Sequence, residues 1–486
     1  MIRRLVILGL CLLVPLAGCT STRVPTYQAV KTEFAAACPL PSGDKPPEKP
    51  VEVSGPLTLR RAIGYALRCN PDRQAALYRI QSSEATVDQT LAAFLPRITA
   101  YGEYTRGDAP SAYLFKLIDQ RNLAPFTNFN DPGTFQNFEV GIKGGWNLYR
   151  GGRDLLARRM AETGLTMSRL DSQSVANALA ASVTKTFYNC LAARDMVGIA
   201  QESVQTVARQ LKVMRVRHRA GGVLKSDVLS LEVRLAQARE GLVRARNNYR
   251  LSLAALANLM GADLDSQFEL AEGQGVDLVI PPDYRQGLEV ALALRPELLK
   301  ARHQVVRARM GLESVRGEYL PTLDAQGSYY LDADTLHLEA DNANWAGGII
   351  LNWDLFTGLS TRAGERRAKA QLAAMLASDR QTTQRVQLEV KSAYLNLQAA
   401  QARLEVSRAS VARARESLKL VTRQYEGGSA GITRYLDAEL ALSRARVRYT
   451  AARYDTAKAR SDIARALGLW ASYTREENRR HVKKSP

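Results

Sequence analysis

The chain contains two copies of one sequence unit. Residues Phe94–Tyr104 read FLPRITAYGEY and recur 225 positions later as YLPTLDAQGSY at Tyr319–Tyr329. Trp146 returns as Trp353, an offset of 207 that then holds for the rest of both copies. The offset changes because the first copy has 18 additional residues (225 − 207) between Tyr104 and Trp146. A duplication of this length means that one structural unit is built twice.

The first residues are typical of an export signal. Two arginines precede an apolar stretch, residues 5–16, that is too short to span a membrane, and Leu16-Ala17-Gly18-Cys19 follows. This end resembles a bacterial lipobox, in which the peptide is cut before the cysteine and the cysteine is acylated. We therefore predict that Cys19 is lipidated, and Thr20 favours sorting to the outer membrane by the same resemblance. A plain signal peptide with a chance cysteine is the alternative.

The composition argues against an enzyme and against a nucleic-acid binder. The net charge is +19, but the basic residues are spread along the chain among acidic ones, and no nucleic-acid-binding module is present. The four histidines are scattered, and no phosphate loop, dinucleotide fingerprint or nucleophile elbow occurs. We expect no catalytic residue, cofactor or metal. Cys38, Cys69 and Cys190 match no metal or redox motif, and nothing selects a disulfide among them.

Two stretches in each copy alternate between apolar and polar residues. They cover residues 98–105 and 137–148 in the first copy, and 323–332 and 344–355 in the second. Such alternation over about ten residues predicts strands of a transmembrane barrel, with the apolar face toward lipid and the polar face toward water. A soluble antiparallel sheet with one buried face predicts the same pattern. Aromatic residues at the strand ends suit the membrane interface: Tyr104, Trp146, Tyr149, Trp353 and Phe356.

Four strands per chain cannot close a barrel by themselves. A sheet that spans lipid must have no open edge, and barrels of this kind begin at eight strands. If the strands span the membrane, several chains must share one barrel, and three chains would supply twelve strands. The additional residues of the first copy fall within Arg106–Thr134, which we predict to be a loop outside the cell.

Each pair of predicted strands is followed by a long helical repeat. Apolar residues recur at spacings of four and three, which indicates a coiled coil, and the helix over Arg153–Arg219 would be roughly 100 Å long. Glycine-rich turns at 220–223 and 427–431 precede a return helix in each copy. Each copy therefore contains an antiparallel helical hairpin with glycines at its tip. A helix interrupted at Pro71 or Pro296 precedes each strand pair.

These features resemble the TolC-like outer-membrane efflux proteins, also called outer membrane factors. The paired Leu-Pro-x-[Ile/Leu]-x-Ala-x-Gly-x-Tyr stretches, the Trp-x-Leu-[Tyr/Phe] strand ends and the glycine-tipped hairpins carry the resemblance over about residues 57–470. The resemblance implies a mainly helical fold with a small transmembrane β part. Three copies would form a twelve-stranded β-barrel that continues into a periplasmic α-helical barrel, as a lipoprotein of the Gram-negative outer membrane.

The resemblance also implies partners and contact residues. In the family the hairpin tips meet a periplasmic adaptor protein, which joins the channel to an inner-membrane pump. The matching tip residues here are Arg219, Gly221, Gly222, Val223, Leu224, Tyr425, Gly427, Gly428, Ala430 and Ile432. Charged residues beside the tips are candidates for a periplasmic gate: Arg217, Arg423, Glu426 and Arg434. A solvated charged face is the alternative for each of these, since surface ion pairs contribute little.

We therefore predict the outer-membrane channel of a tripartite efflux or type I secretion system, acting as a homotrimer. A lipid-anchored periplasmic coiled-coil protein without a pore is the alternative. The sequence leaves the cargo, the pump class and the adaptor open. The predicted organisation is a signal peptide (1–18), an extended tether (19–56), a first repeat (57–283, with a β-hairpin at about 97–149 and a coiled-coil hairpin at about 153–262), a second repeat (284–470, with the equivalents at about 322–356 and about 360–468) and a charged, disordered tail (471–486).

Overall fold

The computed structural model describes residues 26–31, 52–272, 276, 278–337 and 340–473. The chain divides into two units, Met1–Pro46 and Pro47–Pro486. In the first unit residues 27–31 are helical, and the predicted lipidation site Cys19 lies outside the described residues. All that follows concerns the second unit.

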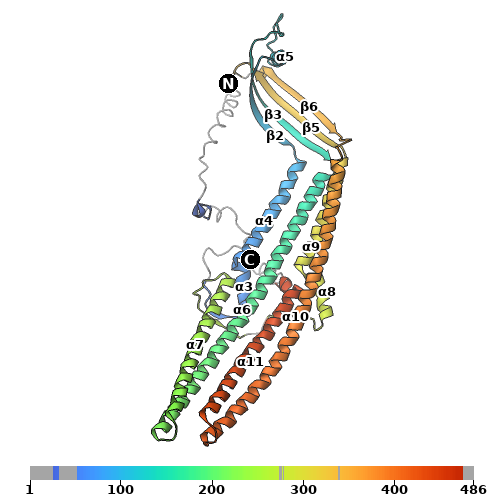
Figure 1. Cartoon of the computed structure of the whole chain (residues 1–486). Helices are drawn as coiled ribbons and strands as arrows, with labels where there is room; N and C mark the ends of the chain where they lie inside the picture. The colour runs from blue at the N-terminus through green and yellow to red at the C-terminus, as the bar shows by residue number, and fades with distance from the viewer. Residues whose placement is uncertain (1–25, 32–51, 273–275, 277, 338–339, 474–486) are drawn as a thin grey trace, which may run out of the picture. The chain divides into compact units, whose positions relative to one another are not determined.

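Long helices and a four-stranded sheet make up the second unit (Figure 1). In chain order its elements are β1 (Gly55–Leu57), α3 (Leu59–Cys69), α4 (Pro71–Leu91), η1 (Ala92–Phe94), β2 (Arg97–Gly107), α5 (Pro110–Asp119), β3 (Phe135–Arg150), α6 (Arg153–Arg219), α7 (Lys225–Met260), β4 (Phe268–Leu270), α8 (Tyr284–Leu294), α9 (Pro296–Arg316), η2 (Gly317–Tyr319), β5 (Thr322–Ala333), η3 (Ala340–Asn342), β6 (Ala343–Asn352), α10 (Ser360–Glu426) and α11 (Ile432–Leu467). The predicted breaks at Pro71 and Pro296 fall between α3 and α4 and between α8 and α9, where each proline is the first residue of a new helix.

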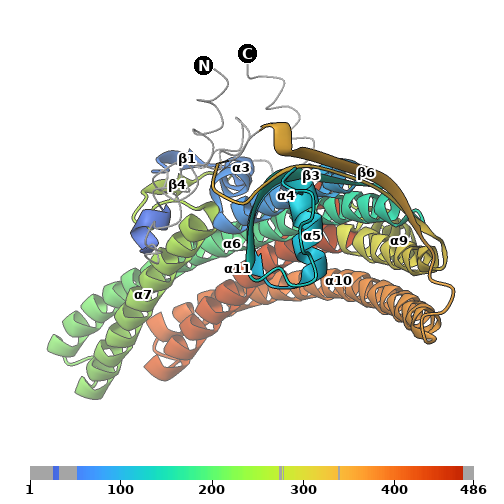
Figure 2. The same cartoon turned by 90° about the horizontal axis from the view of Figure 1, so that it is seen from above.

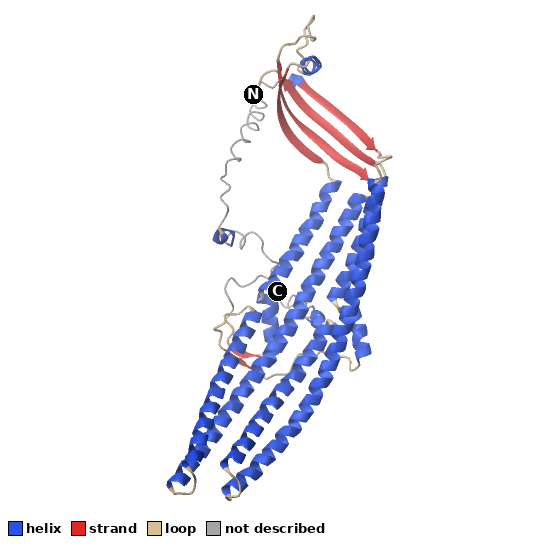
Figure 3. Cartoon of the chain, viewed as in Figure 1, coloured by secondary structure: helices blue, strands red, loops and turns tan. Residues whose placement is uncertain are grey.

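Four of the strands form an antiparallel sheet in the order β2-β3-β5-β6, and β1 pairs in parallel with β4 (Figure 3). Gly102 pairs with Val140, and Tyr329 pairs with both Ile142 and Trp345, so the predicted apolar residues share one face. A β-bulge between Asn147 and Tyr149 shifts the register of β3 against β5. The second strand pair is shorter than predicted, because β6 ends at Asn352.

The apolar face of this sheet is exposed. Ile98 is 74% exposed and Trp345 80%. On the polar face Tyr101 is half-buried, and Arg97 and Lys143 are exposed. A soluble sheet buries its apolar face against its own chain, which this sheet does not do, so the exposures favour the prediction of a face that meets lipid.

Equivalent contacts confirm that the two copies share one design. The Trp146 indole N–H donates to the Phe94 carbonyl at 3.0 Å, and the Trp353 indole N–H donates to the Tyr319 carbonyl at the same distance. Each tryptophan thereby ties the end of a strand to the helix that precedes the sheet. Trp353 lies beyond β6, so its position is fixed by this hydrogen bond and not by strand pairing.

A second pair of equivalent contacts lies where the broken helices meet the return helices. The Asn70 side chain donates to the Leu259 carbonyl, and the Arg295 guanidinium donates to the Ala466 carbonyl, both at 3.1 Å. Gly261 and Gly468 adjoin these sites with φ angles of 65° and 77°. A Cβ at Gly261 would lie 2.4 Å from the Cys69 carbonyl oxygen, so this position requires glycine.

The helical hairpins have equal lengths in the two copies. Helices α6 and α10 have 67 residues each, and α7 and α11 have 36 each. The hairpins pack through α6 and α11, where the Asn177 side chain donates to the Arg465 carbonyl, 288 residues further along the chain. No helix in the described part of the chain is both long and apolar enough to cross a membrane.

The predicted apolar repeat of the hairpins is buried or half-buried along its length, with one departure. His218, the last position of the repeat in the first copy, is exposed, whereas its equivalent Tyr425 is buried. Two other segments also differ from the prediction. The loop over Arg106–Thr134 contains the helix α5, and residues 471–473 of the predicted tail are helical.

Candidate functional site

The polar face of the sheet forms a shallow groove. Arg97, Glu103 and Lys143 line it, together with Asp324 and Gln326 from the second copy. Seen from above, the strands curve and α5 lies within the curve (Figure 2). Charged and polar side chains on a concave surface can face a water-filled passage.

Helix α5 is held against this polar face by a buried network. Lys116 on α5 pairs with Glu139 of β3 at 2.7 Å and with Asp332 of β5 at 3.0 Å. Asp332 is fully buried and also accepts from the Asn137 side chain at 2.7 Å. Gln120, which follows α5, donates to the Asn137 side-chain oxygen at 2.7 Å. Burial disfavours the charged lysine, but the two carboxylates raise the pKa of Lys116 above its ordinary value.

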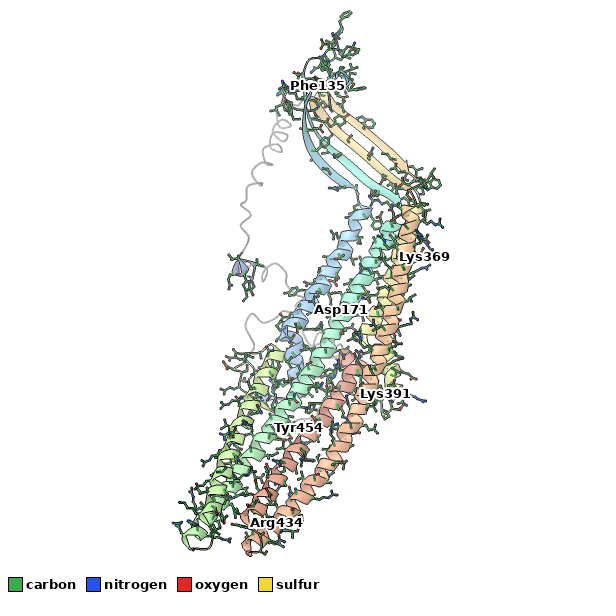
Figure 4. The ribbon with its side chains drawn as sticks, viewed as in Figure 1. Phe135, Asp171, Lys369, Lys391, Arg434 and Tyr454 are labelled. Carbon is green, nitrogen blue, oxygen red and sulfur yellow. The ribbon has the colours of Figure 1, made fainter. Side chains whose placement is uncertain are left out.

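The hairpin tips lie where the glycine turns were predicted. Helix α6 ends at Arg219 and α7 begins at Lys225, and Gly221 between them has a φ of 77°. In the second copy Gly428 has the same φ between α10 and α11. Figure 4 shows Arg434 at the end of the second hairpin. A Cβ at either glycine meets nothing within 4 Å, so glycine is needed there for its left-handed conformation and not for space.

An apolar cluster joins the two tips. Tyr425 of α10 places its hydroxyl 2.6 Å from the Met214 sulfur of α6, its ring centroid is 5.6 Å from that of Tyr435, and the Arg217 guanidinium lies 5.9 Å from the Tyr425 ring centroid. Burial raises the pKa of Tyr425 above its ordinary value. The cluster comprises Val207, Leu211, Met214, Val228, Leu231, Leu235, Val421, Tyr425, Ile432 and Tyr435.

The predicted tip residues therefore divide into three groups. Arg219, Leu224 and the tip glycines are exposed, and Val223 and Ala430 are half-buried against the cluster. Tyr425 and Ile432 are buried between the hairpins and support the shape of the tip. Of the predicted gate residues, Arg217 lies over Tyr425. The others, Arg423, Glu426 and Arg434, are exposed.

A comparison with known protein families identifies the family of this chain. The family model described as outer membrane efflux protein matches residues 62–262 and 287–469, so both copies are covered. The chain is an outer membrane efflux protein. Such proteins are the outer-membrane channels of tripartite efflux and type I secretion systems, extend into the periplasm and are not enzymes.

Individual relatives agree with this assignment. Protein CyaE of Bordetella pertussis is 25% identical over 416 residues, which cover 85% of this chain and 84% of CyaE. The pyoverdine export outer membrane protein OpmQ of Pseudomonas aeruginosa is 21% identical over 468 residues, 96% of each chain. The CmeC outer membrane channel of Campylobacter jejuni shares the fold, with a TM-score of 0.73 at 17% identity over 86% of this chain and 88% of CmeC.

One buried ion pair of this outer membrane efflux protein was missed by the sequence analysis. Glu439 of α11 pairs with Arg234 of α7 at 3.1 Å and accepts from the Ser203 hydroxyl of α6 at 2.9 Å. Both charged side chains are largely buried. The signal was present in the repeat, because a glutamate occurs at the same position in both copies, as Glu232 and Glu439.

Proposed function

We propose that three copies of this chain form one channel through the outer membrane. Among the described residues, the sheet ends at β2 on one side and β6 on the other. An open sheet edge is not tolerated in lipid, so β2 of one copy would pair with β6 of the next in a twelve-stranded barrel. The observation that carries the proposal is an exposed apolar face on a sheet with two open edges.

The polar face would then line the passage, and the hairpin tips would lie at its periplasmic end. We propose that the tips meet a periplasmic adaptor, which receives substrate from an inner-membrane pump. The open backbone around Gly221 and Gly428 supports this role. We further propose that Cys19 carries the lipid anchor, since the lipobox-like Leu16-Ala17-Gly18-Cys19 precedes a proline-rich sequence.

The relatives suggest export, but they do not agree on a cargo. OpmQ is named for pyoverdine export, and the cobalt-zinc-cadmium resistance protein CzcC of Cupriavidus metallidurans, 25% identical over 87% of this chain, is named for metal resistance. Identities this low leave both efflux of small molecules and type I secretion as proposals for this chain.

The trimer and the anchor can be tested together. We expect the protein to leave membranes only with detergent and to run on gels as a trimer that dissociates on heating. The Cys19→Ala variant should still form membrane-inserted trimers, because the barrel and not the lipid holds them there. A soluble monomer from Cys19→Ala would contradict the channel and favour the lipid-anchored structural protein.

The tips can be tested by substitutions that strain the turns. Valine at Gly221 and Gly428 would occupy a left-handed conformation that β-branched residues avoid. We expect this double variant to form normal trimers but to lose export and co-purification of the adaptor in the native host. Unchanged export would contradict our placing of the adaptor contact. Gly164→Val and Gly241→Val, inside helices with open space around them, serve as controls.

A further inference from the structure

We infer that helix α5 narrows the outer mouth of the passage, and that its attachment through Lys116 sets the largest solute that can pass there. The inference rests on the proposed trimer, in which the polar face of the sheet lines the passage. Helix α5 lies at the end of the sheet that is far from the long helices (Figure 1). Because outer membrane efflux proteins extend into the periplasm through these helices, the end that carries α5 is the outer one.

Helix α5 crosses the polar face of three strands. Lys116 pairs with carboxylates on β3 and on β5. On β6 the Asn344 side chain donates to the Asp119 carbonyl at 3.2 Å and accepts from the Arg121 guanidinium at 3.0 Å. Helix α5 is therefore bound along the wall of the passage, within the curve of the strands (Figure 2).

A barrel of twelve strands leaves little room beside such a helix. Strands about 4.8 Å apart and tilted by about 40° enclose a cylinder with a radius of about 12 Å. A helix with its side chains is about 10 Å wide, so α5 on the wall reaches nearly to the axis of the barrel. Each of the three symmetric copies carries one α5, so all three sides of the mouth are narrowed in the same way.

The side of α5 that points away from the wall is apolar. Lys116 and Gln120 are about one helical turn apart, and both bind the sheet. Leu114, Phe115 and Ile118 lie on the other side of the helix. Apolar constrictions in channels oppose the passage of water and ions. The narrowest part of the mouth is therefore lined by side chains that favour neither.

The second copy joins its two strands by a much shorter connection. Residues 108–134 join β2 to β3, whereas residues 334–342 join β5 to β6, and the difference accounts for the 18 additional residues of the first copy. An equivalent strand pair is thus connected without an insertion long enough for α5. Replacing residues 108–134 by a copy of residues 334–342 should remove α5 and keep the sheet.

Access to the inside of the barrel from outside the cell can test this inference. Gln326 lies on the polar face of β5, about 20 Å further in than Asp332. Gln326→Cys is made after Cys38, Cys69 and Cys190 have been replaced by alanine. Intact cells are then treated with polyethylene glycol maleimides of graded length. The longest polymers do not cross the outer membrane elsewhere, so they reach Gln326→Cys only through the outer mouth.

The quantity measured is the reaction rate with the longest polymer as a fraction of the rate with the shortest. Phe126→Cys, in the connection that follows α5, gives the fraction for a fully exposed thiol. With α5 in place, we expect the fraction at Gln326→Cys to be at least tenfold lower than at Phe126→Cys. After the exchange of residues 108–134, it should rise to within twofold of the value for the exposed thiol.

Single substitutions separate the attachment of α5 from its presence. Lys116→Met should release α5 and raise the fraction at Gln326→Cys at least tenfold. Lys116→Arg should keep the fraction low, because it retains a cation for Glu139 and Asp332. Lys143→Met, which removes a cation from the same polar face, is the matched control and should also leave the fraction low.

The outcomes distinguish the inference from the proposed trimer. Equal fractions at Gln326→Cys and Phe126→Cys in the protein with α5, or a fraction that stays low after the exchange, would overturn the constriction by α5 and leave the trimer intact. A fraction that rises after the exchange but not with Lys116→Met would overturn the role of Lys116. No reaction of Gln326→Cys with any maleimide, with or without α5, would instead contradict the proposal that the polar face lines a passage.

Discussion

At the scale of single residues, the duplication preserves contacts and exchanges the side chains that make them. Asn70 and Arg295 bind equivalent carbonyls, yet only Arg295 also forms ion pairs, with Glu297 at 3.0 Å and Glu389 at 2.7 Å. What the two copies share at this position is therefore a side chain that donates a hydrogen bond to that carbonyl. The charges around Arg295 are an addition in the second copy.

The crowded glycines give a prediction about stability. Gly261→Ala should lower the free energy of unfolding by about 3 kcal/mol, because left-handed strain of about 1 kcal/mol is joined by a clash with the Cys69 carbonyl. Gly428→Ala, with open space around it, should show the strain alone. The temperature at which trimers dissociate measures both. Equal losses would mean that the backbone relaxes around Gly261.

The ion pairs of Arg295 give a prediction about pH. Burial opposes ionisation of Glu297, but Arg295 and the Ser174 hydroxyl outweigh it and hold the pKa of Glu297 below its ordinary value. Its contribution to stability is therefore full above an unfolded pKa of about 4.3 and is lost as the pH falls through the lower folded value.

Arg295→Asn, which copies the residue of the first repeat, tests this contribution. The variant should lose about 2–3 kcal/mol at pH 7, since Glu297 is left half-buried without its partner. The loss of stability on acidification should also be smaller than in the native protein, because the folded pKa of Glu297 rises toward its unfolded value. Dissociation temperatures between pH 3 and pH 7 measure both effects, and identical pH profiles would contradict the assignment to Glu297.

At the scale of elements, α5 is the part that the two copies do not share. It lies in the longer loop of the first copy, and Lys116 joins it to β3 and β5 by ion pairs. Lys116→Met would leave Asp332 buried without its cation, at a cost of about 3 kcal/mol. We expect α5 to detach from the sheet. Trypsin added to intact cells should then cleave the protein after Arg121 at least tenfold faster. Lys143→Met, on the same face, should not change the rate.

The elements also show how much of the fold can be predicted from the sequence. The lengths of the hairpins, the faces of the strands and the positions of the tips can be predicted from local periodicity. The second copy of the repeat provides an independent check of each prediction. Helix α5 lies in a segment that the sequence analysis predicts to be a loop, although Pro110 marks a helix start. The network of Lys116 with Asp332 joins residues 216 apart in sequence, and no local pattern encodes such a contact.

At the scale of the whole molecule, the exposed apolar face makes the proposed trimer a membrane protein. Ile349→Lys would place a charge on that face, at a cost of about 2–4 kcal/mol near the middle of the bilayer. Gln326→Lys, on the polar face of the neighbouring strand, should be tolerated. The yield of heat-dissociable trimers in outer membranes measures both. Equal tolerance would mean that this face does not meet lipid.

The hydrogen bond from Asn177 to the Arg465 carbonyl has a consequence for biogenesis. Helix α6 is exported early and α11 almost last, and an amide on one satisfies a carbonyl on the other. The same is true of β2 and β3, whose sheet is completed by strands from the second copy. The first half of the chain therefore cannot finish folding while it is being secreted. It must wait in the periplasm with apolar surface exposed, so holding chaperones are needed until the last helix arrives.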